Sequence, residues 1–154
     1  MIEKTWLVIL ANFIPTVEQV GGIALGLSLG LDPMYTLLLS LFVNSVLFFP
    51  VFLVLEAFYD SFFSKIRIFR NFLERIREKG KPYVDKYGVL GITVLMVLPT
   101  PLSGTYTGTA LSWFLGLDWK KSFLAIFLGS FIGGLVVLAA YYGVFGILKL
   151  FLGV

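Results

Sequence analysis

Three long stretches of this chain carry no charged residue, and they constrain its fold more than any other feature. Residues 34–55, 87–117 and 122–148 contain no Asp, Glu, Lys or Arg. A helix needs about 20 mostly apolar residues to cross the hydrocarbon core of a bilayer, and each stretch reaches that length. The composition agrees, because 58% of the 154 residues are apolar and 14% are charged, against roughly 45–50% and about 25% in soluble domains. The sequence predicts an all-α integral membrane protein.

The chain contains an internal repeat. Residues 15–32 and 101–118 align without a gap, and both begin with Pro and end with Gly-Leu-Asp. Low-complexity apolar sequence explains neither of these shared ends, so we interpret the repeat as a duplication. The identical pairs are Pro15/Pro101, Gly22/Gly108, Ala24/Ala110, Leu25/Leu111, Leu29/Leu115, Gly30/Gly116, Leu31/Leu117 and Asp32/Asp118.

Each copy of the repeat has two short apolar arms, a Pro-containing break between them and a long span after them. An arm of about ten residues covers roughly half of a bilayer core of about 30 Å. Pro99 and Pro101 remove two helix hydrogen bonds within one turn, which favours a re-entrant helical hairpin over a single kinked helix. The predicted arms are 5–14 and 20–31 in the first copy, and 88–97 and 108–117 in the second.

The segment between the two copies, residues 58–86, is basic and amphipathic. Its apolar residues recur in steps of three and four, which predicts a helix lying at the membrane interface. We expect Gly80-Lys81-Pro82 to end this helix. An excess of Lys and Arg marks the cytoplasmic side, although a solvated connector without a special role is the alternative. The residues expected at lipid headgroups are Lys65, Arg67, Arg70, Arg75 and Arg77.

These segments predict one membrane domain over residues 1–154, with repeat one at 5–57, the connector at 58–86 and repeat two at 87–149. A hairpin returns to the side it entered from, so each repeat crosses the membrane once. The second copy is then upside down relative to the first, which makes an inverted repeat. Secondary transporters built in this way hold their substrate between the hairpin tips.

Glu18 is the strongest candidate for a functional residue. It is the only ionisable residue between Lys4 and Asp32, and the hairpin geometry places it deep in the membrane. An Asp at a helix centre costs about 2.5–3.5 kcal/mol on insertion scales, and a Glu should be comparable. We expect Glu18 to couple transport to an ion or to bind substrate. The alternative is a structural role, in which Glu18 caps the positive end of its half-helix.

Further polar and Pro residues gather at the predicted tips. Thr16 and Gln19 have the spacing of a capping box at the start of an arm, and half-helix N-termini suit anionic groups. Asn44 either faces the same cavity or forms a hydrogen bond between helices. Small hydroxyl residues also let membrane helices pack closely, which is the alternative for each of them. The full candidate set is Pro15, Thr16, Glu18, Gln19, Asn44, Pro99, Pro101, Ser103, Thr105 and Thr107.

Several functional classes conflict with the sequence. The chain has no Cys and no His, so neither a hydrolytic triad nor the usual metal sites can be assembled, and it has no phosphate-loop motif. We therefore expect no enzyme activity, no cofactor and no metal. The net charge of +3 comes mostly from the connector, so we expect no nucleic-acid partner. The expected partners are membrane lipids, a proton or sodium ion and a second copy of the chain in a homodimer.

Two motifs resemble the small multi-drug export proteins of archaea and bacteria. The first is Glu18-x-x-Gly21-x-Ile23-x-Leu25-Gly26, and the second runs from 86 to 123 through Leu98-Pro99-x-Pro101-x-x-Gly104-x-Tyr106-Thr107-Gly108. That family in turn resembles the DedA-like (VTT-domain) superfamily. The resemblance implies two facing re-entrant hairpins and transport of polyprenyl-phosphate or other lipid carriers, coupled to protons or sodium.

The chain departs from these families at three points. Val20 and Ala24 stand where the family pattern has Arg and Pro, and no Arg lies between Lys86 and Lys120. We expect a small multi-pass secondary transporter or lipid flippase in the plasma membrane of a prokaryote. The alternatives are an uncoupled channel or scramblase, and a structural membrane protein that recruits anionic lipid or a partner.

Overall fold

A computed structural model describes residues 2–59, 61–98 and 104–152 of the chain. Within these residues the chain forms seven α-helices and one 3-10 helix and contains no strand, as the sequence predicts. Helices α3 and α7 are long and apolar enough to cross a membrane, over Pro33–Phe58 and Trp119–Val144. The elements are α1 (Ile2–Phe13), α2 (Glu18–Ser28), α3 (Pro33–Phe58), η1 (Phe63–Lys65), α4 (Arg67–Tyr87), α5 (Leu90–Val97), α6 (Thr105–Phe114) and α7 (Trp119–Leu152).

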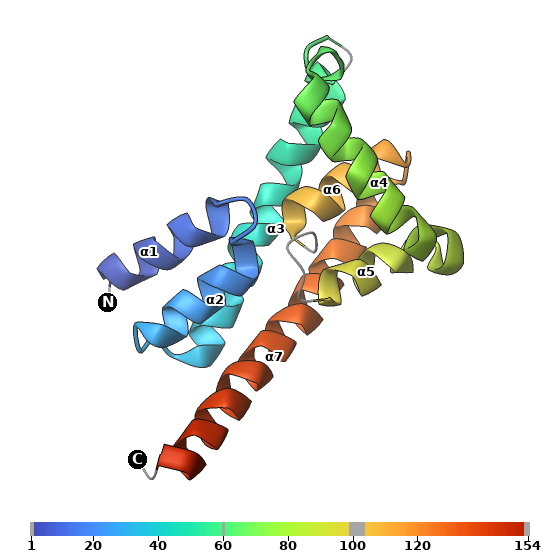
Figure 1. The fold of residues 1–154 in the computed structure, drawn as a ribbon. Helices are drawn as coiled ribbons and strands as arrows, with labels where there is room; N and C mark the ends of the chain where they lie inside the picture. The colour runs from blue at the N-terminus through green and yellow to red at the C-terminus, as the bar shows by residue number, and fades with distance from the viewer. Residues whose placement is uncertain (1, 60, 99–103, 153–154) are drawn as a thin grey trace.

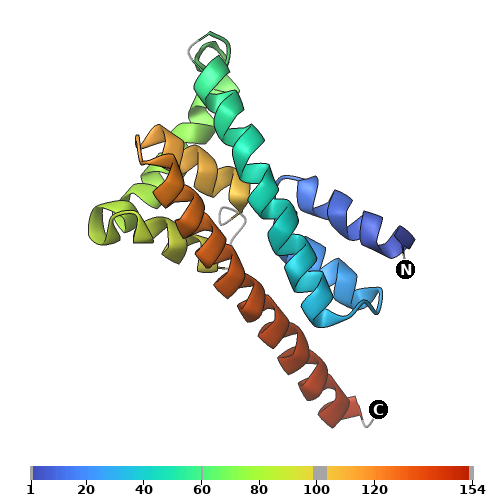
Figure 2. The ribbon, with the colours of Figure 1, turned by 180° about the vertical axis from the view of Figure 1, so that it is seen from behind.

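Four of the helices are only half as long as a membrane span. Helices α1, α2, α5 and α6 have 12, 11, 8 and 10 residues, which corresponds to about 12–18 Å each. They overlap the four predicted arms. Helices α1 and α2 lie on one side of the two long helices, and α4, α5 and α6 lie on the other side (Figures 1 and 2).

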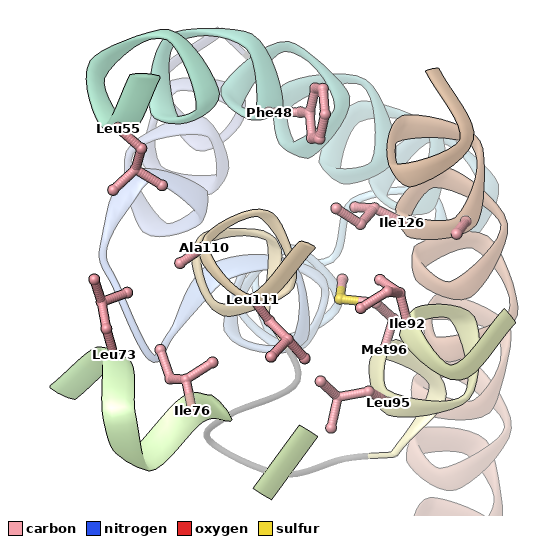
Figure 3. Close-up of a cluster of buried hydrophobic side chains, with 11 residues drawn as sticks. Phe48, Leu55, Leu73, Ile76, Ile92, Leu95, Met96, Ala110, Leu111 and Ile126 are labelled. Carbon is pink, nitrogen blue, oxygen red and sulfur yellow. The ribbon is translucent and has the colours of Figure 1, made fainter. Parts of the chain in front are cut away.

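Helix α6 lies at the centre of the larger hydrophobic core. Its Ala110 and Leu111 are surrounded by buried side chains from α3, α4, α5 and α7 (Figure 3). This half-length helix is therefore enclosed by protein. The surrounding residues include Phe48, Leu55, Leu73, Ile76, Ile92, Leu95, Met96 and Ile126.

Helix α4 corrects the prediction for the connector. We expected Gly80-Lys81-Pro82 to end the helix, but α4 continues through Pro82 to Tyr87. Gly80 instead allows close packing, because a Cβ there would overlap the side chain of Leu111. Leu73 and Ile76 are buried in the same contact. Packing against α6 therefore compensates for the hydrogen bond that Pro82 cannot donate.

The turns that lead into the two long helices are built alike. Gly30 and Gly116 have positive φ angles of 75° and 67°, which favour glycine. Asp32 and Asp118 each accept a hydrogen bond from the N–H group three residues later, at 2.8 Å and 3.0 Å. Other bonds of the turn also recur 86 residues later: Leu29 to Leu25 and Leu115 to Leu111, Leu31 to Gly26 and Leu117 to Ser112, Thr36 to Asp32 and Ser122 to Asp118.

Candidate functional site

A group of buried polar side chains lies where α1, α2, α3, α6 and α7 meet. Glu18 is the only ionisable member among the buried residues that the structure describes, and it is 5% exposed. Because burial of a charge without partners is costly, the surroundings of this carboxylate define the site. The group also includes Asn12, Gln19, Ser40, Asn44, Thr105 and Ser130.

The carboxylate of Glu18 lies at the N-terminus of α6. Its Oε2 atom accepts a hydrogen bond from the backbone N–H of Thr105, the first residue of α6. The backbone N–H groups of Tyr106 and Thr16 also interact with it. A Cβ at Gly104 would overlap the carboxyl group, so glycine makes room for it. The positive end of a helix favours a negative charge, and Glu18 therefore caps α6 and not α2, the helix to which it belongs.

The backbone that presents Glu18 is strained. Thr16 and Glu18 have φ angles of 75° and 39°, in a region that residues with a Cβ rarely adopt. Each such residue costs on the order of 1–3 kcal/mol and persists only where the surroundings determine it. The hydrogen bonds from the backbone of α6 to the carboxylate hold Glu18 in this conformation.

The predicted capping box of Thr16 and Gln19 is wrong. The N-cap of α2 is Val17, which makes no side-chain capping bond, and Thr16 lies exposed in the turn before it. Gln19 instead donates a hydrogen bond from Nε2 to the carbonyl oxygen of Ser130 on α7, at 2.8 Å. A contact across 111 residues replaces the local one that the spacing suggested.

Asn44 connects the two halves through a chain of hydrogen bonds. Its Nδ2 donates to Oδ1 of Asn12 at 2.6 Å, and its Oδ1 accepts from the hydroxyl of Thr105 at 3.0 Å. Asn12 also donates to the hydroxyl of Ser40 at 3.2 Å. Of the two roles considered for Asn44, the structure therefore assigns the hydrogen bond between helices. Asn12 was not among the candidate residues, although it is the one amide in its predicted apolar arm.

Two of these contacts are related by the 86-residue offset. Gln19 on α2 bonds to Ser130 on α7, and Thr105 on α6 bonds to Asn44 on α3. Position 105 is 19 + 86, and position 44 is 130 − 86. Each short helix thus contacts the long helix of the other repeat at the corresponding position.

A small cavity of about 40 Å³ lies beside the carboxylate. Its lining includes Glu18, Gln19, Gly104, Thr105 and Ser130. A cavity needs a volume of at least roughly 10–15 Å³ to hold one buried water. This cavity therefore has room for a few waters or a small ion. Sites for drug-sized ligands measure about 300–1,000 Å³, so this conformation does not hold such a ligand here.

A larger, almost wholly apolar groove of about 430 Å³ runs along α3. Tyr106 is one of its lining residues, and the hydroxyl of Tyr106 donates to the carbonyl oxygen of Phe13 at 2.9 Å. This bond joins the end of α1 to the start of α6. The groove has the size of a small-molecule site and suits a hydrocarbon chain. It is lined by Phe13, Leu47, Pro50, Val51, Val54, Leu55, Phe63, Phe69 and Tyr106.

The remaining predicted residues are scattered. Pro15 is exposed in the turn between α1 and α2, and Thr107 is buried in α6 away from the small cavity. Pro99, Pro101 and Ser103 lie outside the described residues. The predicted headgroup residues Lys65, Arg67, Arg70, Arg75 and Arg77 are all exposed.

These features define an all-helical membrane protein with a buried polar centre between half-length helices. The chain belongs to a family described as "putative small multi-drug export protein", whose family model matches residues 18–136. This match confirms the resemblance seen in the two motifs. No curated protein and no solved structure matches the chain.

Proposed function

We propose that this chain is a small secondary transporter or lipid flippase of the DedA-like type, located in the plasma membrane of a prokaryote. In this proposal the pairs α1–α2 and α5–α6 are re-entrant hairpins of an inverted repeat, and the substrate passes between their tips. The half-length helices and the two turns with matching hydrogen bonds support this arrangement. The export-protein family and the two long apolar helices support a role in membrane transport.

The observation that carries the proposal is the position of Glu18. A buried carboxylate of one hairpin bonds to the backbone of the other, beside a cavity with room for a small ion. A proton or a sodium ion at Glu18 would neutralise the charge that holds the two tips together. Ion binding would thereby be linked to separation of the hairpins, which is what coupled transport requires.

The apolar groove supports a lipid-like substrate. Its apolar lining and its size fit part of a hydrocarbon chain, such as that of a polyprenyl-phosphate, and Tyr106 at the start of α6 is one of the lining residues. The proposal includes a homodimer, because Pro15 lies in an exposed turn between two half-length helices and a second copy would help to cover this irregular backbone within the membrane.

We predict that Glu18→Gln abolishes the coupling. The wild-type protein in proteoliposomes should move a fluorescent short-chain phosphatidic acid or a cationic dye faster when a proton or sodium gradient is imposed. Glu18→Gln keeps the shape of the side chain but removes its charge, so the imposed gradient should no longer change the rate. Glu56→Gln is the matched control, because Glu56 is an exposed carboxylate on α3.

Each outcome of this experiment selects one function. Wild-type coupling in a well-folded Glu18→Gln protein would contradict the proposed role. Movement that ignores the gradient in the wild type would identify an uncoupled channel or scramblase. Absence of movement of both probes would favour a structural membrane protein that recruits anionic lipid or a partner through the basic helix α4.

The proposal also fixes an orientation. Basic residues put α4 in the cytoplasm, and the turn after α2 then lies outside. Because the chain has no Cys, single cysteines at the exposed positions Asn71 and Ser28 can be labelled selectively. We predict that a membrane-impermeant maleimide added to intact cells labels Ser28→Cys but labels Asn71→Cys only after lysis. The reverse pattern would overturn the orientation.

A further inference from the structure

We propose that the N-terminus of α6 is a binding site for the anionic group of the substrate, a carboxylate or a phosphate. In the present conformation Glu18 occupies this site, and the substrate anion displaces it. This inference deepens the proposed transport function and rests on it, because it names the chemical class of the substrate at the same centre.

The geometry at the end of α6 is that of an anion site. Backbone N–H groups of Thr105, Tyr106 and Thr16 face one carboxylate. The first N–H groups of a helix have no partner within the helix, and a buried helix end needs one. Gly104 keeps the approach to these groups free of a side chain. Glu18 itself demonstrates that a carboxylate fits.

Ser130 provides a second and independent observation. It is 4% exposed and lines the same cavity as Gly104 and Thr105, yet its hydroxyl has no hydrogen-bond partner among the described residues. An unsatisfied buried hydroxyl is unfavourable, and it can donate to an anion. A ligand at the end of α6 would satisfy this hydroxyl as well as the N–H groups.

The site binds an anion without a basic side chain. No Lys or Arg lines the cavity in the described part of the chain, and the sequence has no Arg between Lys86 and Lys120. The helix end and the hydroxyl therefore supply the positive potential that an Arg would otherwise supply. This accounts for an anionic substrate in a chain without an Arg in its second hairpin.

Glu18 and the substrate anion exclude each other, because the cavity is small and the two charges repel. Protonation makes Glu18 a poorer acceptor and removes the repulsion, so one proton accompanies each anion bound. The phenol of Tyr106 on α6 also interacts with Glu18. The residues that line the cavity from the turn, α2, α5 and α7 include no other titratable side chain in the described residues. Anion affinity should therefore rise as pH falls, by up to about tenfold per pH unit while Glu18 is ionised.

Chemical rescue tests the site directly. Glu18→Ala removes the resident carboxylate, and sodium formate should then fill the vacancy. We expect saturating formate to raise the thermal unfolding midpoint of purified Glu18→Ala protein by roughly 5–10 °C relative to equal sodium chloride, and to leave the wild type at alkaline pH almost unchanged. Glu56→Ala is the control, because it removes a carboxylate that accepts one bond from Trp113 at 2.6 Å, at the C-terminal end of α6 and away from its N-terminus.

A pair of substitutions at Thr105 isolates the N–H group. Pro is well tolerated at the first position of a helix, and Gly104 has the extended backbone, φ −83° and ψ 170°, that a residue before Pro requires. Thr105→Ala and Thr105→Pro both lose the hydroxyl, but only Pro loses the N–H. Combined with Glu18→Gln, the Pro substitution should weaken formate binding at least tenfold relative to the Ala substitution.

The results separate this inference from the proposed function. No rescue by formate in folded Glu18→Ala protein, or equal rescue in Glu56→Ala, would overturn the anion site even if Glu18→Gln abolished coupling. If Glu18→Ala does not fold, pH-independent formate binding to Glu18→Gln and pH-dependent binding to the wild type decide the question, and equal pH dependence overturns the inference. Inorganic phosphate and a short-chain phosphatidic acid then distinguish a free phosphate from a lipid headgroup.

Discussion

Replacing Gly104 with Ala is expected to lower the free energy of unfolding by about 2–3 kcal/mol. The new Cβ would overlap the carboxyl group of Glu18, which would leave the end of α6. Hydrogen bonds to a charged group contribute about 1.5–3 kcal/mol each, and the displaced carboxylate would stay partly buried. Unfolding in mixed micelles measures the effect. Gly143→Ala on α7 is the control, because a Cβ there meets nothing within 4 Å and should be neutral.

A double variant shows whether Glu18 is the cause. Glu18→Ala removes the group that the Cβ of Ala at position 104 would meet, so the two substitutions should cost clearly less together than the sum of their separate costs. Additive losses would mean that Gly104→Ala acts through another contact, and the close packing of Gly104 against Glu18 would be wrong.

The second large effect is expected at Gly91, where α5 meets the end of α4. A Cβ at Gly91 would overlap backbone atoms of Tyr83 and Val84, and backbone cannot move aside as a flexible side chain can. We expect Gly91→Ala to cost about 3 kcal/mol and to separate α4 from α5. The free energy of unfolding and the rate of proteolysis within α4 measure the two consequences.

The neighbouring residue supplies the control for this prediction. Leu90 is 64% exposed, so Leu90→Ala should change stability little, although it alters more atoms than the single Cβ that Gly91→Ala adds. Wild-type stability of Gly91→Ala would contradict the close packing of α4 on α5. It would also favour the view of α4 as a solvated connector without a special role.

The helices could be predicted from the sequence because their signals are local. Long charge-free stretches gave α3 and α7, and the internal repeat with its Pro residues gave the half-length arms. The prediction of where α4 ends was wrong, because tertiary packing and not the local sequence determines the end of this helix. Gly80 and Pro82 are ordinary helix stop signals, but Leu73, Ile76 and Gly80 are packed against α6 and hold the helix together.

Four members of the buried polar group, Glu18, Gln19, Asn44 and Thr105, were among the candidate residues, but none of their hydrogen-bond partners was predicted. Glu18 could be found because a single carboxylate in an apolar arm is unfavourable to insert into a membrane, and such residues usually have a function. The partner of Glu18 could not be predicted, because Thr105 is 87 residues away. Its backbone N–H group, which forms the bond, is common to all residues except proline and gives no sequence signal. The partner of Gln19 could not be predicted for the same reason, since it is a backbone carbonyl oxygen on α7. Asn12 was overlooked although a single amide among apolar residues is a signal.

The two copies of the repeat cannot carry the same side chain at the position where Glu18 meets Gly104. Position 104 corresponds to position 18 under the 86-residue offset, and the space that a side chain at 104 would enter is already filled by the carboxyl group of Glu18. If both positions 18 and 104 were Glu, their two side chains would compete for the same space at the N-terminus of α6. An engineered chain built from two exact copies of the first half would therefore be frustrated at its centre, and the glycine in the second copy is what lets an asymmetric pair close.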